Sequence, residues 1–227
     1  MSGKISVVIP AYNAEKYLGE AIDSVAAAMG GTLPPAEIIV VSDGSTDGTA
    51  AVAAGKNAVL IEKERAGAAA ARNAGLRAAS GALIAFLDAD DVLTPGALSE
   101  MYERMLRTGA DAVFARAEDF LSPELTEEER ARLAVRNGPY AGCLPGCSLI
   151  RRSVFDAMGP FDESLRSGET VQWMMKLKDS GLPTAALDRV TIRRRIHLTN
   201  TGRVARGQEM KNYAAILRMR NKRPSGQ

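Results

Sequence analysis

Apolar and polar positions alternate along the first half of the chain in a pattern that predicts repeated strand–helix units. Short apolar runs, typical of buried strands, lie at residues 5–9, 37–41, 58–61 and 82–87. Longer stretches of helical character lie at residues 14–28, 47–54, 68–79 and 95–107. Thr94 is the expected cap of the last helix, and Gly109 its end. The alternation predicts βαβ units, and therefore an α/β fold with a mostly parallel central sheet flanked by helices.

The second half of the chain is less regular. After an expected strand at residues 112–117, residues 122–137 mix glutamates with arginines and hold few large apolar groups, which predicts an exposed helix or a mobile flap. Glycine and proline recur from residue 138 to 161, which is typical of loops beside a binding cleft. A helix at residues 167–180 and two strands, at 183–187 and 189–196, are expected to follow.

Composition narrows the class of protein. At 227 residues, with 46% hydrophobic and 25% charged residues, the chain resembles a soluble globular protein and fits one domain with a large core. A formal net charge of +2 argues against nucleic-acid binding through bulk electrostatics. The sequence contains no apolar run long enough to span a membrane and no signal-peptide core before the first strand, so we expect a cytoplasmic protein. Cys143, Cys147 and a single histidine are too few for a closed structural zinc site.

The strongest chemical signal follows the fourth apolar run, where Asp88, Asp90 and Asp91 place three carboxylates within four residues. Their repulsion is costly unless something offsets it, and in open α/β sheets ligands bind outside the carboxyl ends of the strands. Hard oxygen ligands at that edge suit Mg²⁺ or Mn²⁺, and such an ion keeps open positions for substrate phosphates. The alternative is structural: Asp91 caps the next helix, while Asp88 and Asp90 are solvated loop residues.

Two other strand ends bring polar or aromatic groups to the same edge of the predicted sheet. Tyr12 and Asn13 follow the first strand, and Asp43 follows the second within the sequence Asp-Gly-Ser-Thr-Asp. Asp43 could accept a hydrogen bond from a nucleobase N–H, and Tyr12 could stack on the base. The structural alternatives are a turn-forming role for Asp43 and an interfacial role for Tyr12. Ser45 or Asp47 is expected to cap the helix that follows.

In order and spacing, four motifs resemble those of family 2 glycosyltransferases, which have the GT-A fold. They are Pro-Ala-Tyr-Asn from Pro10, Val-Ser-Asp-Gly-Ser-Thr-Asp from Val41, Ala-Arg-Asn-Ala-Gly from Ala71, and Phe-Leu-Asp-Ala-Asp-Asp from Phe86. The resemblance implies a single domain in which residues 1–117 bind a nucleotide-sugar donor and residues 118–200 form the acceptor-binding and catalytic half. It further implies transfer of a sugar, with a UDP-sugar favoured, to an unknown acceptor with inversion.

The resemblance also assigns roles to single residues. Asp90 would bind Mn²⁺ or Mg²⁺ within an Asp-x-Asp motif, and Asp88 would face the ribose or sugar. Arg72 would meet a phosphate or brace a carboxylate, with Arg65 as a looser candidate. The donor-binding residues implied are Pro10, Tyr12, Asn13, Asp43, Arg65, Arg72, Asp88 and Ala89. His197, in Arg-x-His-x-x-Asn, resembles a late element that approaches metal or phosphate, although a lone histidine is more often structural.

The resemblance further implies that the catalytic base belongs to a carboxylate pair at the start of a late helix. In the family this pair follows a Gly-Phe-Asp-Glu segment, which the sequence Gly-Pro-Phe-Asp-Glu at residues 159–163 resembles. The pair here is Glu169-Thr170, and a threonine hydroxyl cannot act as a base near neutral pH. Glu169 is therefore the candidate catalytic residue. The alternatives are a nucleophile that needs less help, or a catalytically weak or inactive protein that binds nucleotide sugars. If the missing carboxylate is the defect, Thr170→Asp should raise turnover.

The last segment, residues 201–227, carries seven lysine and arginine residues and one glutamate, and is expected to form a basic helix or tail. Four apolar side chains share one helical face there, those of Met210, Tyr213, Ile216 and Leu217. This face could lie on an anionic membrane or guide a lipid-linked acceptor, whereas the more common arrangement is a helix packed on its own domain. The expected partners are a nucleotide-sugar donor and a glycan, lipid-linked or protein acceptor, with peripheral membrane contact as an option.

Overall fold

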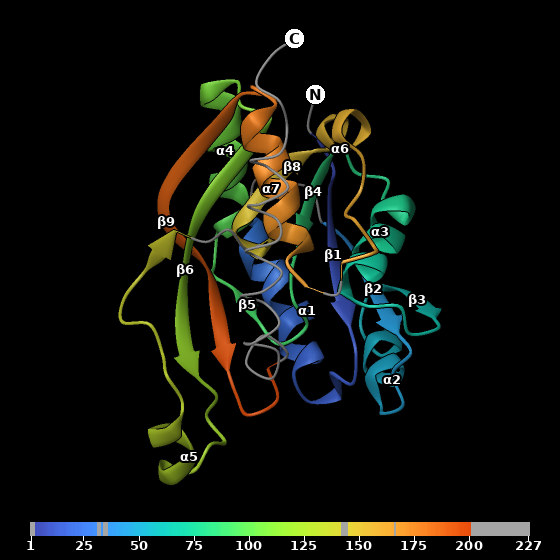
Figure 1. The fold of residues 1–227 in the computed structure, drawn as a ribbon, viewed down its shortest axis with the longest axis vertical. Helices are drawn as coiled ribbons and strands as arrows, with labels where there is room; N and C mark the ends of the chain where they lie inside the picture. The colour runs from blue at the N-terminus through green and yellow to red at the C-terminus, as the bar shows by residue number, and fades with distance from the viewer. Residues whose placement is uncertain (1–2, 31–32, 34–35, 142–144, 166, 201–227) are drawn as a thin grey trace.

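The computed structural model describes residues 3–30, 33, 36–141, 145–165 and 167–200. One mixed sheet forms its centre (Figure 1). The strands are β1 (Ile5–Ala11), β2 (Glu37–Asp43), β3 (Val59–Lys63), β4 (Leu83–Phe86), β5 (Val92–Leu93), β6 (Ala112–Leu121), β7 (Tyr140–Ala141), β8 (Ser148–Arg151) and β9 (Thr184–Ile196). They follow the order β3-β2-β1-β4-β8-β6-β9-β5, with β7 paired to β6.

Strand direction decides which ends share an edge. β1, β2, β3 and β4 run parallel, and β8 is antiparallel to both β4 and β6. Because β9 is parallel to β6, it runs in the same direction as β4. The residues that follow β9 therefore come to the same edge of the sheet as those that follow β1, β2 and β4.

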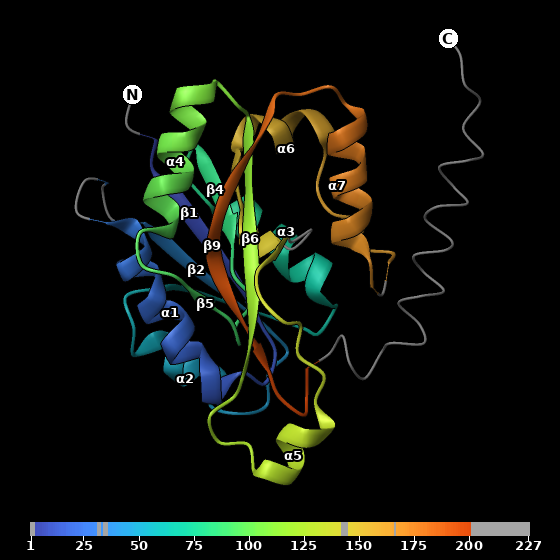
Figure 2. The same cartoon turned by 90° about the vertical axis from the view of Figure 1, so that its left-hand side faces the viewer.

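Helices cover both faces of the sheet (Figure 2). One face carries α1 (Glu15–Met29), α2 (Thr49–Ala54) and α4 (Ala97–Thr108), and the other carries α3 (Ala68–Ala78), α6 (Arg152–Met158) and α7 (Glu169–Asp179). Neighbouring residues of β1 join opposite cores: Val7 packs with Leu18 of α1 and Leu98 of α4, while Val8 packs on the side of Trp173. Burial of these apolar side chains is the main force that holds the layers together.

The structure confirms the α/β fold and the predicted elements of the first half, but the start of α4 differs from the prediction. No side chain caps this helix. It begins directly after Gly96, and this glycine adopts a left-handed backbone conformation (φ 74°). The hydroxyl of Thr94 donates instead to the carbonyl of Val190 (2.9 Å), so the capping role predicted for Thr94 is wrong. Gly109 ends the helix as predicted, with φ 67°.

The two strands predicted at residues 183–187 and 189–196 are one strand, β9. It pairs with β6 along most of its length, across an irregular register between Phe114 and Ala117. The polar pair Asp188-Arg189 reads as a break in the sequence. In the structure the strand runs on, but Asp188 lies where the pairing with β6 shifts from Phe114–Ala186 to Arg116–Val190, and its side chain binds Arg116 (2.5 Å).

Residues 122–137 contain a short exposed helix, α5 (Glu127–Arg132), as one of the two predictions for this segment states. A capping box opens it, in which Thr126 accepts from the Glu129 N–H and the Glu129 carboxylate accepts from the Thr126 N–H (2.8 Å). Within the described residues, no helix has the length and apolar character that crossing a membrane requires. The amphipathic segment predicted near the end of the chain lies outside the described residues.

Candidate functional site

The carboxylates that follow β4 form a tight turn, in which the Asp91 N–H donates to the Asp88 carbonyl (3.0 Å). Asp90 Oδ2 lies 3.0 Å from His197 Nε2 and accepts from Asn200 Nδ2 at 3.1 Å. His197 and Asn200 follow β9, so the shared direction of β4 and β9 brings together residues that are far apart in sequence. The other ring nitrogen, Nδ1, lies 3.0 Å from the hydroxyl of Thr199.

Asp90 Oδ2 and His197 Nε2 lie at the distance of a direct hydrogen bond, and the same separation is compatible with a shared metal ion. Two neighbouring ligands of an octahedral ion, each about 2.1 Å from the metal, are about 3.0 Å apart. Carboxylate oxygen and imidazole nitrogen are suitable donors for Mn²⁺. Among the described residues, no cluster of three or more metal-ligating side chains occurs, so an ion held here would take its remaining ligands from donor phosphates and water.

Asp91 is buried beneath the turn, and its Oδ1 accepts from the backbone N–H of Arg195 (2.9 Å). Burial raises the pKa of Asp91 well above its ordinary value, and the charges of Asp90 and Asp88 raise this pKa further. Because α4 begins after Gly96 without a side-chain cap, the capping role considered for Asp91 is wrong. Asp91 instead ties the carboxylate turn to β9.

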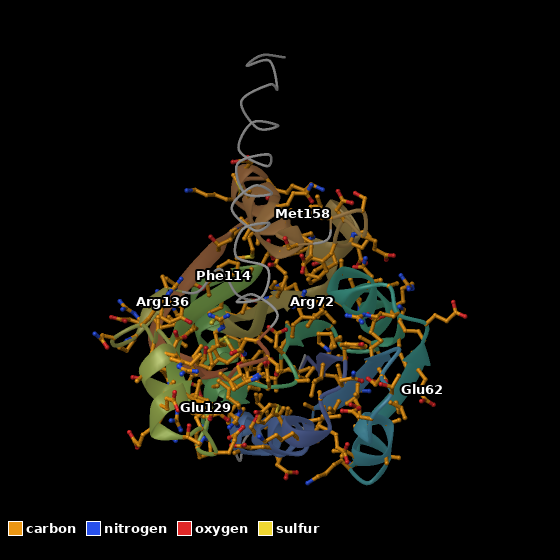
Figure 3. The ribbon with its side chains drawn as sticks, turned by 60° about the horizontal axis from the view of Figure 1, so that its bottom comes forward. Glu62, Arg72, Phe114, Glu129, Arg136 and Met158 are labelled. Atoms are coloured by element: carbon orange, nitrogen blue, oxygen red, sulfur yellow. The ribbon has the colours of Figure 1, made fainter. Side chains whose placement is uncertain are left out.

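Arg72, on α3, lies between two carboxylates from different parts of the chain, near the middle of the view in Figure 3. Its Nη1 donates to Glu169 Oε1 (2.7 Å), and its Nη2 donates to Asp88 Oδ1 (2.8 Å). Burial alone would lower the pKa of Arg72, but the two carboxylates outweigh it and raise this pKa. The Asp88 side chain is 42% exposed, whereas that of Glu169 is 10% exposed, so Asp88 is the more accessible of the two.

Asp43, at the end of β2, is buried and already holds several donors. Its Oδ1 accepts from Lys63 Nζ (2.6 Å) and the Ala66 N–H (3.0 Å), and its Oδ2 accepts from the Gly67 N–H (2.7 Å). Burial raises the pKa of Asp43, but these hydrogen bonds, led by that of Lys63, outweigh it and lower this pKa. The carboxylate therefore shapes the loop that leads into α3, and any contact with a base would add to these bonds.

Tyr12 and Arg65 form a pair beside the end of β1. Arg65 Nη1 donates to the Tyr12 hydroxyl (2.6 Å), and the guanidinium lies over the ring, 3.7 Å from its centroid. Tyr12 is 41% exposed, so an ordered aromatic ring faces solvent at this edge. Asn13 adopts a positive φ (48°) and accepts from the Thr46 N–H (2.9 Å), which joins the loops after β1 and β2.

The remaining predicted residues fall into two groups. Pro10 is half-buried in β1 and Ala89 is buried in the turn, so they offer a ligand shape and backbone rather than polar side chains. The N-cap of α2 is Gly48 and no side chain caps this helix, so the capping role predicted for Ser45 or Asp47 is wrong. Asp47 lies one residue earlier, where its Oδ1 accepts from the Thr49 N–H (3.0 Å) and its Oδ2 accepts from the Glu15 N–H of α1 (3.1 Å). The hydroxyl of Ser45 accepts from the Asn13 N–H (3.1 Å).

Thr170 and Glu169 face different surroundings at the start of α7. Glu169 follows Gly168, whose φ is 83°, and turns toward Arg72. Thr170 lines a cavity of about 10 Å³ on the other side of the helix start. The remaining lining is mostly apolar and consists of Phe86, Ser148, Ile150, Phe161, Trp173 and Met174. Position 170 is therefore half-buried at the edge of this mostly apolar cavity.

Three residues that hold the site together, Asn200, Arg195 and Lys63, are not among the site residues predicted from the sequence. Asn200 and Arg195 belong to the Arg-x-His-x-x-Asn element, so that motif carries a usable signal for them. Lys63 meets Asp43 because β2 and β3 place the two residues opposite each other, a register that the sequence does not provide. A larger cavity of about 440 Å³ lies along α1 and the start of β2, and none of the candidate residues lines it.

Comparison with solved structures identifies the fold of this chain. TarS 1-349 of S. aureus, in complex with UDP-GlcNAc, is 22% identical with a TM-score of 0.71, over 87% of this chain and 60% of that chain. Glucosyl-3-phosphoglycerate synthase of Mycobacterium tuberculosis, in complex with Mn²⁺, UDP and phosphoglyceric acid, is 22% identical with a TM-score of 0.69, over 99% of this chain and 80% of that chain. The chain therefore has the GT-A fold, as predicted.

Comparison of sequences identifies the family. Glycosyltransferase AglE of Haloferax volcanii is 31% identical over 195 residues, which are 78% of this chain and 62% of AglE, so the chain spans less than two thirds of this relative. Residues 6–159, well over half of the chain, match the family model described as Glycosyl transferase family 2. With its four ordered motifs and its GT-A fold, the chain belongs to glycosyl transferase family 2.

Proposed function

We propose that this chain moves a sugar from a nucleotide-sugar donor, with a UDP-sugar favoured, to an acceptor with inversion and with the help of a divalent metal. The observation that carries the proposal is the meeting of Asp90 and His197 at the carboxyl end of β4. Membership of the family supports it, and so do the two solved neighbours, which contain UDP or UDP-GlcNAc. Residues 1–117 would form the donor half, and residues 118–200 the acceptor half.

The proposed roles follow from the contacts. Asp90 and His197 would hold Mn²⁺ or Mg²⁺, which when bound offsets the negative charge of the donor diphosphate. Tyr12 would lie beside the base, and Asp88 would accept from a ribose or sugar hydroxyl. In the transfer, the acceptor oxygen attacks the anomeric carbon, the bond from that carbon to the diphosphate breaks, and Glu169 takes the acceptor proton.

A second candidate, a catalytically weak protein that binds nucleotide sugars, is favoured by two contacts. Glu169 already accepts a hydrogen bond from the buried Arg72, so one of its two carboxylate oxygens is occupied. Thr170 lines an apolar cavity and offers no carboxylate in its place. Both candidates require the same donor site, so donor binding tests what they share and turnover separates them.

Titration of the purified protein with UDP and GDP, with and without Mn²⁺, tests the proposed function. We expect Mn²⁺ to tighten UDP binding by at least about tenfold, which corresponds to about 1.4 kcal/mol. The UDP-sugar conjugates are then followed for slow hydrolysis. Metal-dependent binding with hydrolysis supports an active transferase. Metal-dependent binding without hydrolysis supports the second candidate, a catalytically weak protein that binds nucleotide sugars. If neither nucleotide binds, the donor site is wrong for both candidates.

Thr170→Asp is expected to destabilise the protein rather than to raise turnover. The new carboxylate would lie beside Phe86, Phe161 and Trp173 at a half-buried position, and partial burial without a cationic partner costs about 1–2 kcal/mol. Chemical denaturation at neutral pH measures this change in the free energy of unfolding. Thr170→Asn is the matched control, because it has nearly the same shape as aspartate but no charge. A Thr170→Asp variant that hydrolyses UDP-sugars faster at unchanged stability would contradict the surroundings assigned to this position.

A further inference from the structure

Arg195 is a buried arginine at the end of β9, with a residue exposure of 2%. A buried guanidinium is destabilising unless its N–H groups find acceptors. Here Nε donates to the carbonyl of Asp90 (2.9 Å), and Nη1 donates to the hydroxyl of Ser122 (3.4 Å). Nη2 binds the carboxylate of Glu20 on α1 (2.5 Å). The side chain thus connects the carboxylate turn, the residue that follows β6 and α1.

The main chain of the same residue holds the other parts of the site. Its N–H donates to Asp91 Oδ1 (2.9 Å), and its carbonyl accepts from Asn200 Nδ2 (3.0 Å). Asn200 contacts Asp90 through that same nitrogen, and its Oδ1 accepts from the backbone N–H of His197 (2.6 Å). Arg195 is therefore bonded both to the turn that carries Asp90 and to the loop that carries His197.

The guanidinium also supports the histidine ring indirectly. It lies over the ring of Tyr17, 4.9 Å from the centroid, and the Tyr17 ring packs against His197 with 4.8 Å between centroids. A planar cation can donate to acceptors in its plane while its faces contact aromatic rings. Tyr17 is thus held between the guanidinium and the imidazole, which restricts how the imidazole can turn.

We propose that Arg195 is the positioning residue of the metal site: through these bonds it keeps the Asp90 carboxylate and the His197 imidazole at the separation that one ion can bridge. The inference rests on the proposed function, since it concerns the same metal site. In this role Arg195 would act through its hydrogen bonds to other residues and not as a ligand of the ion. Its contribution is that the two ligands are ordered before the metal arrives.

Arg193 provides a matched control on the same strand. Its guanidinium lies 4.5 Å from the Phe120 centroid, and that of Arg195 lies 4.7 Å from the same centroid. Arg193 is exposed, whereas Arg195 is buried. Replacement of either arginine removes one positive charge and one contact with Phe120, but only replacement of Arg195 removes the side-chain bond to the Asp90 carbonyl.

The test uses the fact that His197 is the only histidine of the chain. Its imidazole signals in the NMR spectrum of the full chain therefore report on this site alone, and Mn²⁺ bound there broadens them. MnCl₂ without nucleotide is titrated into the wild-type protein and into the Arg195→Gln, Arg195→Lys and Arg193→Gln variants. We expect the Mn²⁺ concentration for half broadening to rise about 10–100-fold in Arg195→Gln and to stay unchanged in Arg193→Gln.

Arg195→Lys keeps the positive charge but loses the planar fork, so we expect a smaller rise, of at least about fivefold. The same variant decides the question if Arg195→Gln does not fold. Equal Mn²⁺ requirements in the wild type and in folded Arg195 variants would overturn the positioning role. Absence of broadening in the wild type would instead overturn the metal site of the proposed function, so the two failures can be told apart.

Discussion

Replacement of Arg72 with methionine is expected to destabilise the protein by about 3–5 kcal/mol, because it leaves two carboxylates without their shared cation. Arg72 donates to Glu169 and to Asp88, and Glu169 is nearly buried. Methionine fills much of the same volume, so the effect comes mainly from the lost charge. For a domain of this size the loss corresponds to a fall in Tm of about 10 °C. Thermal and urea unfolding at neutral pH measure it.

Two further variants separate this effect from a general loss of charge on α3. Arg77→Met is the control, since Arg77 is exposed on the same helix and should change stability by less than about 0.5 kcal/mol. Glu169→Gln in the Arg72→Met background removes one unpaired carboxylate and should recover part of the stability. A double variant as unstable as the sum of the two single ones would show that Arg72 and Glu169 do not interact.

Replacement of Asp90 with alanine is expected to abolish the metal-dependent part of nucleotide binding. Asp90 supplies the carboxylate oxygen that lies 3.0 Å from His197 Nε2, and one imidazole alone is a weak ligand for Mn²⁺. We expect the Kd of UDP in the presence of Mn²⁺ to rise to the value measured without the metal, that is, by at least about tenfold. Binding measured without Mn²⁺ should change little.

Asp188→Ala is the control for this experiment. Asp188 is 84% exposed and binds Arg116 on the sheet, away from the carboxylate turn, so its removal tests the loss of a carboxylate elsewhere on the same protein. We expect its Kd for UDP with Mn²⁺ to match that of the wild type. Full retention of metal-dependent binding in Asp90→Ala would overturn the assignment of this residue as a metal ligand.

The predictions from sequence succeed where the pattern is local. The strands and helices of the first half carry continuous apolar runs and helical spacing, and each appears close to its predicted bounds. The pattern fails in β9, because Asp188 and Arg189 lie at an irregularity in its pairing with β6, which a single strand accommodates without ending. β8, only four residues long, lies within the glycine- and proline-rich segment and gives too short a signal to detect.

In the site, too, the residues with a local sequence signal could be predicted, and those whose contacts depend on long-range packing could not. Asp88 and Asp90 are visible from sequence because an apolar run ends abruptly at them, and His197 because it lies in a motif. Their partners depend on long-range geometry: Lys63 meets Asp43 through strand register, and Arg72 meets Glu169 through the packing of α3 and α7 on one face. Nothing in the sequence near position 170 indicates that Thr170 borders a small apolar cavity, because its other lining residues come from distant parts of the chain.

The continuity of β9 also limits how this chain can change in length. Alternate residues of a strand face opposite sides, so a deletion of one residue between Ile192 and Arg195, where β9 pairs regularly with β6, would exchange the sides of the positions after it. Arg195 would then leave the core, and the loop that carries His197 would be drawn along the strand. Insertions should instead be accepted beside α5, which buries none of its residues. In related chains, length differences should therefore collect between β6 and β7 and avoid the last strand.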